Sequence, residues 1–488
     1  YFVEPGNNDY LIAFVRDNDN TGPAASNAIN LSLINSYQGL AGGGNSTEIS
    51  DFDPVSNRLF VTNASKDRFE ILDLSDPRNI VKIDSVDIST FGVINSIAVK
   101  NGVVATAIEA SGTMSAGTVA FYDTDGVLLN SVAVGVLPDM VTFTPNGNKV
   151  IAACEGEPNA DYTQDPEGSI AIIDVSGGIA SLSNANVTLL NFNSYDSQIA
   201  SLRSQGIRIF GPNASVSKDM EPEYVTVSPN GSTAFVACQE NNVLVIVDLN
   251  TNSISNIVPL GWKNHALVGQ GLDSDRGSNE IHIATAPFRG FYMPDAIASY
   301  EVSGTTYVVT ANEGDSRDYN GYSEEDRLDD LTLDADSFPN AEILFDAYGD
   351  IKVTLANGDI DNDGDYDHIY TYGARSFSIW NGSTGALVYD SGDDFEQIVS
   401  NHPRYRAFFN TSGNGLTIKN RSDDKGPEPE AVTIATIGAA TYAYVGMERT
   451  GGVMVYDISS PSNPVFVDIN IPRDTATGNG DLGPEGLV

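Results

Sequence analysis

Acidic side chains that could bind a metal ion occur at repeated places in this chain. "DMEPEYV" (219–225), "KGPEPEAV" (425–432) and "LGPEGLV" (482–488) each put a glutamate beside a proline, just before an apolar step. Carboxylate oxygens are the ligands that Ca²⁺ and Mg²⁺ prefer. Since like charges at close quarters need a cation or a raised pKa to coexist, the repeated motif predicts a cation site. The alternative is structural: proline fixes the entry to a strand and the acid accepts turn hydrogen bonds.

The densest acidic stretch is "DIDNDGDYD" (359–367). Its alternating carboxylates, around a turn that Gly364 permits, are typical of a calcium-binding loop. The glutamate that closes an EF-hand loop is replaced by Tyr370, which argues against a helix pair. We therefore expect a calcium loop of a β-type, with a solvated acidic turn as the alternative, and an ion there could serve only to order the segment. The expected ligands are Asp359, Asp361, Asp363, Asp365 and Asp367.

Basic side chains lie close in sequence to these acids, and three of them are candidate catalytic residues: Arg317, Arg375 and Arg449. An arginine beside a metal held by carboxylates can bind a phosphate group through its planar fork. Each could equally be the counter-charge of a neighbouring acid. The chain has no GxSxG motif and its four histidines occur singly, so water activated by a metal ion is the candidate nucleophile.

A repeat in the sequence indicates how these residues are positioned. "LPDMVTFTPNGNKVIAACEGEP" (137–158) and "EPEYVTVSPNGSTAFVACQENN" (221–242) share an acid, two apolar alternations and a Pro-Asn-Gly turn between them. Such a pattern predicts a β-hairpin. A third apolar strand follows each copy, at 168–176 and 242–250. The unit is that of a four-stranded propeller blade.

Seven inner strands begin near Glu48, Asn95, Asp139, Glu223, Asp295, Glu430 and Glu485. A spacing of about 45 residues, stretched by insertions, matches the blade period of a propeller. We expect an all-β fold, a seven-bladed β-propeller over residues 28–488, with an N-terminal extension at 1–27 and a last blade cut off at 488. A short helical insertion is expected at about 190–218, and a long acidic one, with the calcium loop, at about 313–370.

A propeller gathers the starts of its inner strands at one mouth of a central channel, so the acids there should meet. A second tier follows each hairpin, including Glu109, Glu155, Glu313 and Glu448. Glu428 has a match at Glu221 but not in the last blade, which makes it a candidate site-specific ligand. The expected channel ligands are Glu48, Asp139, Glu155, Glu223, Asp295, Glu313, Glu428, Glu430, Glu448 and Glu485. They would hold calcium and a second metal, iron or magnesium.

The amino-acid composition limits the classes of ligand and metal ion that the chain could bind. Asp and Glu number 66 against 25 Lys and Arg, a formal net charge of -41, which would repel nucleic acid. Few histidines and only Cys154 and Cys238 disfavour a soft metal site. The two cysteines occupy equivalent places in the repeat, as buried strand residues or else as a thiolate ligand or a disulfide. No apolar run is as long as a membrane helix.

Several ordered motifs resemble one family. "SLRSQGIRIFGPNASVSKDMEPEYVTVSPNG", "ANEGDSRDY", "DGDYDHIYTYGARSFSIWN" and "RSDDKGPEPEAV" are similar to the choice-of-anchor I proteins of bacteria, which in turn resemble the mesenchyme-specific cell surface glycoprotein of biomineralising animals. The resemblance implies a secreted or surface-anchored propeller, often labelled alkaline-phosphatase-like. A looser resemblance links it to bacterial alkaline phosphatases that hold iron and calcium on a propeller.

We therefore expect an extracellular, calcium-binding propeller with metal-dependent phosphoesterase activity, acting on a phosphate ester or another small anion. The alternative is a non-catalytic, calcium-dependent surface, matrix or filament protein that acts in adhesion, self-assembly or mineral handling. Either would be secreted or lie at the cell surface.

Overall fold

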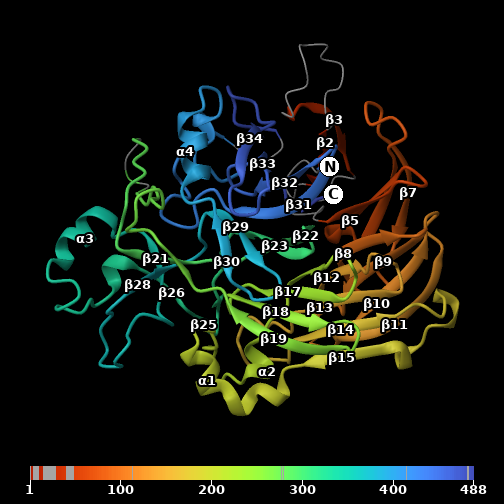
Figure 1. The fold of residues 1–488 in the computed structure, drawn as a ribbon, viewed down its shortest axis with the longest axis horizontal. Coiled ribbons are helices and arrows are strands. Elements are labelled where there is room, and N and C mark those ends of the chain that lie inside the picture. The colour runs from red at the N-terminus through yellow and green to blue at the C-terminus, as the bar shows by residue number, and fades with distance from the viewer. Residues whose placement is uncertain are drawn as a thin grey trace.

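The computed structural model describes residues 29–39, 49–112, 114–275, 277, 280–413, 415–480 and 483–488, together with the backbone of 2–3 and 10–14. Seven of the sheets in this part of the chain have four antiparallel strands each. Their strand order, shown in Figure 1, is nearly always the order of the sequence. The fold is therefore a repeat of one small antiparallel unit, as the hairpin pattern predicted.

The first four of these sheets follow one another along the chain. The first contains β4 (Ser50–Asp53), β5 (Arg58–Asn63), β6 (Arg68–Asp73) and β7 (Val81–Asp87). The second contains β8 (Val93–Lys100), β9 (Val103–Glu109), β10 (Ala116–Asp123) and β11 (Leu128–Val136). The third contains β12 (Pro138–Phe143), β13 (Lys149–Cys154), β14 (Ser169–Asp174) and β15 (Val187–Asn191). The fourth contains β16 (Tyr224–Val227), β17 (Thr233–Cys238), β18 (Val243–Asp248) and β19 (Ser253–Pro259).

The remaining three sheets are interrupted or closed by distant segments. The fifth contains β22 (Ile297–Val302), β23 (Thr305–Asn312), β29 (Ser376–Asn381) and β30 (Leu387–Asp390). The sixth contains β31 (Pro429–Ile437), β32 (Ala440–Met447), β33 (Val453–Asp457) and β34 (Val465–Asn470). The seventh contains β35 (Gly486–Leu487), β1 (Phe2–Val3), β2 (Tyr10–Phe14) and β3 (Leu33–Gln38).

The first strands of the seven sheets form a closed cycle. β4 contacts β8, and the contacts continue through β12, β16, β22, β31 and β35 back to β4. Apolar clusters lie between adjacent sheets, as where Phe121 and Val134 of the second pack with Ala152 and Ile173 of the third. This arrangement is a β-propeller, which confirms the predicted fold class. The predicted first-strand positions from Asn95 to Glu485 all fall within or just before such a strand.

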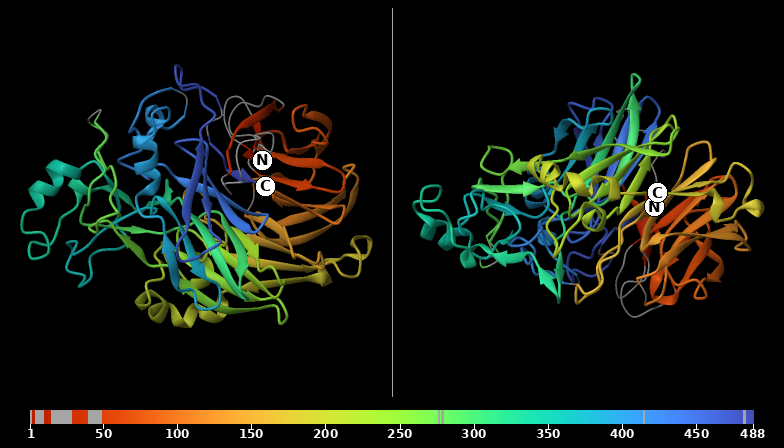
Figure 2. Two further views of the ribbon diagram at one scale, coloured as in Figure 1. Left: turned by 45° about the horizontal axis from the view of Figure 1, so that its top comes forward. Right: turned by 90° about the horizontal axis from the view of Figure 1, so that it is seen from below.

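The seventh sheet differs from the expectation of a truncated blade after an N-terminal extension. β35 pairs antiparallel with β1, and β1 with β2, so residues from 1–27 supply two of its strands. The two ends of the chain lie side by side in both views of Figure 2. Because β1 from the start of the chain pairs with β35 from its end, neither strand is left with an open edge at that side. The short apolar run at 10–14 gave too weak a signal to predict this.

The repeated hairpins have the predicted turns. In the third sheet Thr144 N–H donates to the Lys149 carbonyl, and Gly147 has a φ of +72° that favours glycine. The fourth sheet repeats this with Ser228 and Gly231. Cys154 and Cys238 end the second strands of these sheets as free, buried thiols, so the structure favours the strand-residue interpretation over a disulfide.

Insertions cover one side of the propeller. The predicted helical one holds α1 (Ile199–Ser204) and α2 (Val216–Asp219). The long acidic one runs between β23 and β29 and holds β24 (Asp318–Tyr319), β25 (Tyr322–Ser323), β26 (Glu325–Arg327), α3 (Ala341–Tyr348), β27 (Lys352–Thr354) and β28 (Ile369–Thr371). Two further insertions were not predicted: one holds β20 (Trp262–Asn264) and β21 (Phe288–Phe291), the other α4 (Asp394–Asn401).

Single turns of 3-10 helix complete the described elements: η1 (Ala64–Lys66), η2 (Ile179–Ser181), η3 (Asn184–Asn186), η4 (Asn193–Gln198), η5 (Leu328–Asp330) and η6 (Arg406–Phe408). In the described ranges, no helix is both long and apolar enough to cross a membrane. The insertion with α3 lies beside the ring of sheets rather than on its axis, as both Figure 1 and Figure 2 show.

Candidate metal centre

A polar cavity of about 510 Å³ opens where the first strands of the fourth, fifth and sixth sheets begin. Its walls come from these strand ends, from the ends of the second strands and from the insertions. Nine carboxylates and four basic side chains take part. The lining residues are Glu223, Gln239, Asp295, Glu313, Asp315, Ser316, Asp318, Glu325, Lys352, Arg421, Asp424, Lys425, Glu430, Glu448 and Arg449.

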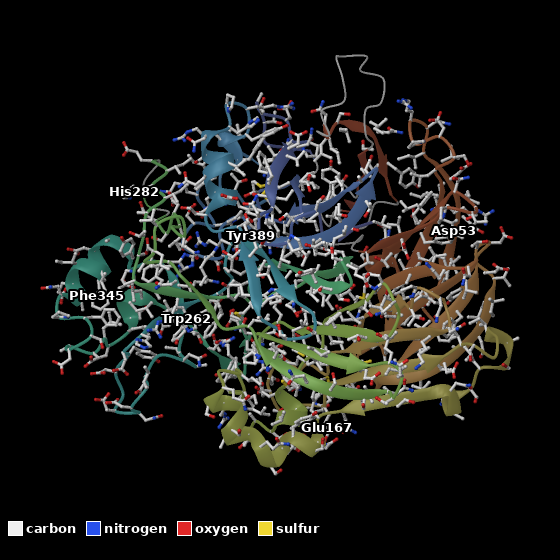
Figure 3. All side chains as sticks on the ribbon, viewed as in Figure 1. Asp53, Glu167, Trp262, His282, Phe345 and Tyr389 are labelled. Carbon is white, nitrogen blue, oxygen red and sulfur yellow. The ribbon has the colours of Figure 1, made fainter. Side chains whose placement is uncertain are left out.

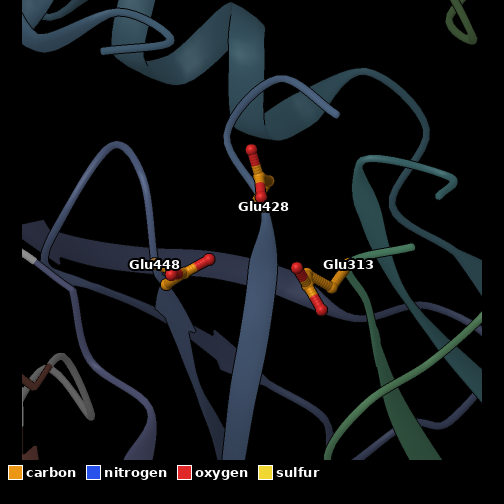
Figure 4. A group of neighbouring side chains, drawn as sticks. All are labelled: Glu313, Glu428 and Glu448. Atoms are coloured by element: carbon orange, nitrogen blue, oxygen red, sulfur yellow. The ribbon is translucent and has the colours of Figure 1, made fainter. Parts of the chain in front are cut away.

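Two groups of three glutamates converge at the edge of this cavity closely enough to share an ion, although Glu428 and Glu485 themselves do not line it. Glu313, Glu428 and Glu448 form one group, and Glu430, Glu448 and Glu485 form the other. In each, the nearest carboxylate oxygens lie within 4.8 Å of one another. Figure 4 shows the first group around the start of β31, with one residue from the end of β23 and one from the end of β32. Both predicted tiers of acids therefore contribute, and Glu448 belongs to both groups.

Basic side chains already compensate the negative charge of Glu428. Arg421 Nε lies 2.6 Å from one Glu428 carboxylate oxygen, Arg449 Nε lies 3.3 Å from the other, and Lys425 Nζ lies 3.4 Å from that same oxygen. Burial alone would raise the pKa of Glu428, but the charges of Lys425, Arg421 and Arg449 lower it below its ordinary value. A fully buried glutamate with three cationic neighbours has little need of a metal ion.

Lys425 is the centre of this cationic group. Its Nζ lies 2.5 Å from Glu313 and 3.4 Å from Asp315. Burial would lower the pKa of Lys425, but the charges of Asp315, Glu313 and Glu428 raise it well above its ordinary value. The ammonium group is therefore a fixed positive charge at the place where the first group of glutamates converges.

The Glu428 backbone is also unusual, with a φ of +51° between two prolines. A side chain other than glycine in the left-handed region costs about 1 kcal/mol or more. The ion pairs described above hold it there.

In the second group, Glu448 shares Arg449 with Glu428, and Glu430 is less well compensated. One carboxylate oxygen of Glu430 is buried without a hydrogen-bond partner in the described residues. Burial, followed by the charges of Glu448 and Glu485, raises the pKa of Glu430 well above its ordinary value. Burial and the neighbouring Glu428 also raise the pKa of Glu448, to about 8. A cation among these oxygens would remove the mutual repulsion.

Other predicted ring acids lie beside this second group. The carboxyl of Asp295 lies within hydrogen-bonding reach of that of Glu430, and burial together with the charge of Glu313 raises the pKa of Asp295. Burial and Asp295 do the same to Glu223, one of whose oxygens is buried without a partner in the described part of the chain. Adjacent carboxyl groups of this kind share either a proton or a cation. The donor set consists only of oxygen, which suits Ca²⁺ or Mg²⁺.

Several predicted residues lie elsewhere. Glu48 is outside the described residues. Asp139 and Glu155 do not line the cavity, although burial and nearby acids raise the pKa of Glu155. Of the three candidate arginines only Arg449 lines it. Its Nη1 lies 2.7 Å from Glu448, and its side chain keeps 37% of its surface exposed.

Arg317 and Arg375 are instead ion-paired away from the cavity. Arg317 lies 2.7 Å from both Asp219 and Glu221. Arg375 lies 2.8 Å from Glu396 and donates three further hydrogen bonds to backbone carbonyls. Both guanidinium groups are buried. The counter-charge interpretation therefore fits these two residues, and Arg449 is the one of the three that lies at the cavity.

Sequence reasoning missed the contribution of the long insertion. Glu325 and Lys352 lie 2.9 Å apart at the cavity wall, and Ser316 donates a hydrogen bond of 2.7 Å to Glu325. Glu240 was also missed: burial raises its pKa to about 7, and one of its oxygens is buried without a partner in the described ranges. The insertion does not follow the spacing of the repeat, so the sequence offers no signal that Glu325 and Lys352 would line the cavity. Glu240 follows directly after Gln239, which matches Glu155 in the repeat.

The acidic loop at 359–367 brings three of its five aspartates together: Asp359, Asp361 and Asp363. Asp359 accepts a hydrogen bond of 3.1 Å from Gly364 N–H, and its other oxygen is buried without a partner among the described residues. Desolvation, followed by the charge of Asp363, raises the pKa of Asp361. Asp367 instead accepts from Ile360 N–H at 2.8 Å, which stabilises the loop. The first half of the loop therefore brings together three carboxylates, which are part of the set of 6–8 oxygens that a calcium ion takes.

Fold and site together define a β-propeller with an acidic cavity at one mouth of its ring. The sequence supports a more specific assignment. A model of the choice-of-anchor I domain matches residues 48–461, and the chain belongs to this family. The resemblance predicted from the motifs is thereby confirmed at the level of the family.

Two curated relatives carry informative names. Gigasin-3a of Magallana gigas is 34% identical over 117 residues, which cover 23% of this chain and 40% of that protein. The mesenchyme-specific cell surface glycoprotein of Strongylocentrotus purpuratus is 24% identical over 299 residues, 52% of this chain and 37% of that protein. The chain thus aligns with well under half the length of either relative. The family and the second relative fit an extracellular surface protein.

Solved structures show only remote likeness. A hydrazine synthase from Kuenenia stuttgartiensis has a TM-score of 0.42 and 11% identity, with 84% of this chain and 76% of that chain covered. A protein from Lactobacillus plantarum has a TM-score of 0.37 and 12% identity, with 63% and 72% covered. The strand order of the chain itself, rather than these likenesses, defines its fold.

Proposed function

We propose that this chain is an extracellular propeller whose acidic cavity binds a divalent cation, calcium first, and uses it to hydrolyse phosphate esters. One observation carries the proposal: Glu430, Glu448 and Glu485 converge on one point, and a buried oxygen of Glu430 has no partner in the described residues. Glu223 and Asp295 lie in the same cavity and could complete the 6–8 oxygen ligands of calcium. A second metal, magnesium or iron, remains part of the proposal for the wider ring of acids.

Arg449 and Lys425 supply the anion-binding side of the cavity. Arg449 spans Glu428 and Glu448. A cation that takes the Glu448 carboxylate would compete with Arg449 for it and release one edge of the guanidinium fork. That edge is suited to two oxygens of a phosphate group. A bound cation would also polarise the phosphate and lower the pKa of water.

The chain's own groups then have defined tasks in hydrolysis. Arg449 and Lys425 stabilise the charge on the phosphoryl oxygens while a water oxygen bonds to phosphorus and the ester P–O bond breaks. The departing alkoxide takes a proton from a protonated carboxyl of the cavity, and the water proton passes to an ionised one. Burial of these carboxyls keeps some of them protonated near neutral pH.

The experiment measures cation binding and turnover separately. The chelator-treated protein is titrated with CaCl₂ by calorimetry, and hydrolysis of p-nitrophenyl phosphate and bis-p-nitrophenyl phosphate is followed with Ca²⁺, Mg²⁺ or Fe³⁺ added. Glu430→Gln is expected to lose cavity binding and turnover, and Arg449→Gln to bind calcium but lose turnover. Asp359→Asn, in the loop outside the cavity, is the matched acid control and should keep turnover. A calcium stoichiometry that is unchanged in Glu430→Gln would overturn the cavity assignment.

A second candidate function has an observation of its own. The group of Asp359, Asp361 and Asp363 lies in an insertion and lines no part of the cavity, so an ion there would order a surface segment. Together with the cell-surface name of one relative, this favours a calcium-dependent surface or matrix protein without turnover. Calcium binding at both sites, with no hydrolysis of either ester under any metal, would select this function over the phosphoesterase.

A further inference from the structure

The three-stranded sheet of β20, β21 and β28 carries a row of aromatic and cationic side chains on one face. Arg289 stands opposite Asn264 on one neighbour strand and opposite Tyr370 on the other. Its guanidinium carbon lies 4.4 Å from the centre of the Trp262 ring and 5.6 Å from that of Tyr370. Side chains of paired residues point to the same face of a sheet. Arg289 is therefore clamped between two rings.

The row continues inward as an alternation of rings and guanidinium groups. Tyr370 stacks on Phe291 with ring centres 4.6 Å apart. Arg208 follows, 4.8 Å from Phe291, then Phe210 at 4.4 Å from Arg208. Guanidinium stacking of this kind fixes the cation's plane and aims its N–H donors sideways.

The arginines of this row differ in whether a carboxylate pairs with them. Arg208 pairs with the carboxylate of Glu324, and Arg317, 4.8 Å from Phe210, pairs with Asp219 and Glu221. Arg289 has no carboxylate partner in the part of the chain that the structure describes. Among the described residues, its one hydrogen-bond acceptor is the hydroxyl of Tyr370, at 3.1 Å.

The exposed end of the row is Trp262, whose residue surface is 39% exposed although Arg289 stacks on it. Figure 3 shows Trp262 on the part of the molecule that carries β21 and β28. Asn264, two residues along the same strand, accepts from Ala266 N–H and offers an amide group beside Arg289. The surface thus combines an aromatic face, a planar cation and a neutral hydrogen-bonding group.

From this we propose that the exposed face of β20, β21 and β28 binds a uronic-acid polysaccharide, whose carboxylate pairs with Arg289 while its sugar ring packs on Trp262. A uronic acid holds a carboxylate at a fixed distance from the apolar face of a pyranose ring, which matches an arginine clamped against an indole. The planar guanidinium fork fits a planar carboxylate. An acidic peptide could satisfy Arg289 but would leave the exposed indole without a specific contact.

The experiment is calorimetric titration with a hyaluronan hexasaccharide, in calcium buffer so that charge in the 359–367 loop is shielded. Binding by the wild type is expected, with an affinity reduced at least about tenfold by Arg289→Met, since a charge-assisted hydrogen bond is lost. Methionine keeps the length of the side chain between the rings. Arg289→Lys, which keeps charge but not the fork, should fall between the two.

Matched controls make the result specific. Arg404 also stacks on a ring, 5.3 Å from the centre of Tyr405, without a carboxylate partner in the described ranges, and Arg404→Met should leave affinity unchanged. Trp262→Ala should weaken binding with an unchanged melting temperature. Neutral cellohexaose should not bind. Absence of binding by the wild type, equal binding of polyglutamate, or an unchanged affinity in Arg289→Met would each overturn the proposal.

Discussion

Exchanging one oxygen for nitrogen at Glu428 and at Glu430 should have opposite effects on stability, although the two residues are two positions apart. Glu428 is surrounded by Arg421, Lys425 and Arg449, and one oxygen of Glu430 has no partner in the described residues. In chelator-treated protein, Glu428→Gln is therefore expected to destabilise the fold and Glu430→Gln to stabilise it. The two variants have the same size and the same change of charge, so each is the control for the other.

The magnitudes follow from burial and partners. Removing one member of a buried ion pair costs about 3–5 kcal/mol. The side chains of Arg421 and Arg449 are 21% and 37% exposed and can regain water, so about 3 kcal/mol is expected for Glu428→Gln. At Glu430 the substitution removes a buried carboxyl that must either take up a proton or stay charged beside Glu448, Glu485 and Asp295. Relief of that penalty is worth about 1 kcal/mol or more.

Calcium should then reverse the order of stability between Glu430→Gln and the wild type. A ligand at a hundred times its dissociation constant stabilises the folded state by about 2.7 kcal/mol. The wild type and Glu428→Gln should gain this from the cavity site, and Glu430→Gln should gain only what the loop site at 359–367 supplies. Urea unfolding followed by circular dichroism, with EDTA and with CaCl₂, measures all six values for the three proteins. A destabilised Glu430→Gln in EDTA, or one that gains as much stability from calcium as the wild type, would refute the assignment of the cation to this group.

Further expectations concern sites away from the cavity. The imidazole of His265 is buried, and its pKa is lowered to about 3. As the pH falls below about 6.5, this histidine takes up a proton in the unfolded chain but not in the folded one. The free energy of unfolding should therefore fall by about 2 kcal/mol between pH 7 and pH 5. His265→Gln should remove that part of the pH dependence of urea unfolding, and an unchanged slope would contradict it. Arg317→Met leaves two buried carboxylates unpaired and should cost about 3–5 kcal/mol in the same assay, with turnover per folded molecule retained because the residue lies outside the cavity. Asp359→Asn should lower the calorimetric calcium stoichiometry by one site and leave the effect of Glu430→Gln intact; an unchanged stoichiometry would argue for a solvated turn.

The repeat made much of this fold predictable from sequence. Strand alternation and the Pro-Asn-Gly turn are local properties, so they located the first strands and the acids beside them. The same register placed Glu313 and Glu448 after their hairpins, on the side of the cavity. Local patterns cannot reveal pairing across hundreds of residues. The closure of β35 by β1 was therefore missed, as were the walls contributed by Glu325 and Lys352.

The sequence also could not say which acids keep an unpaired charge. Arg317 lies between Asp315 and Asp318 in sequence, and Arg375 follows the acidic loop. Their partners are nevertheless Glu221 and Glu396, which other segments contribute. Lys425 comes from a connection without repeat register, and its side chain distinguishes one group of glutamates from the other. The choice depends on how insertions fold over the propeller mouth, which no spacing rule describes.

Glu448 belongs to both groups of glutamates, so cation binding at one group should be coupled to anion binding at the other. It lies 2.7 Å from Arg449 on one side and converges with Glu430 and Glu485 on the other. A cation bound on the second side weakens the hold of Glu448 on the arginine, which then becomes available to an anion. An anion bound to Arg449 in turn leaves Glu448 free to be a stronger ligand for the cation. Since such coupling is reciprocal, calcium should raise the affinity for inorganic phosphate by the same factor by which phosphate raises the affinity for calcium, and both effects should vanish together in Arg449→Gln.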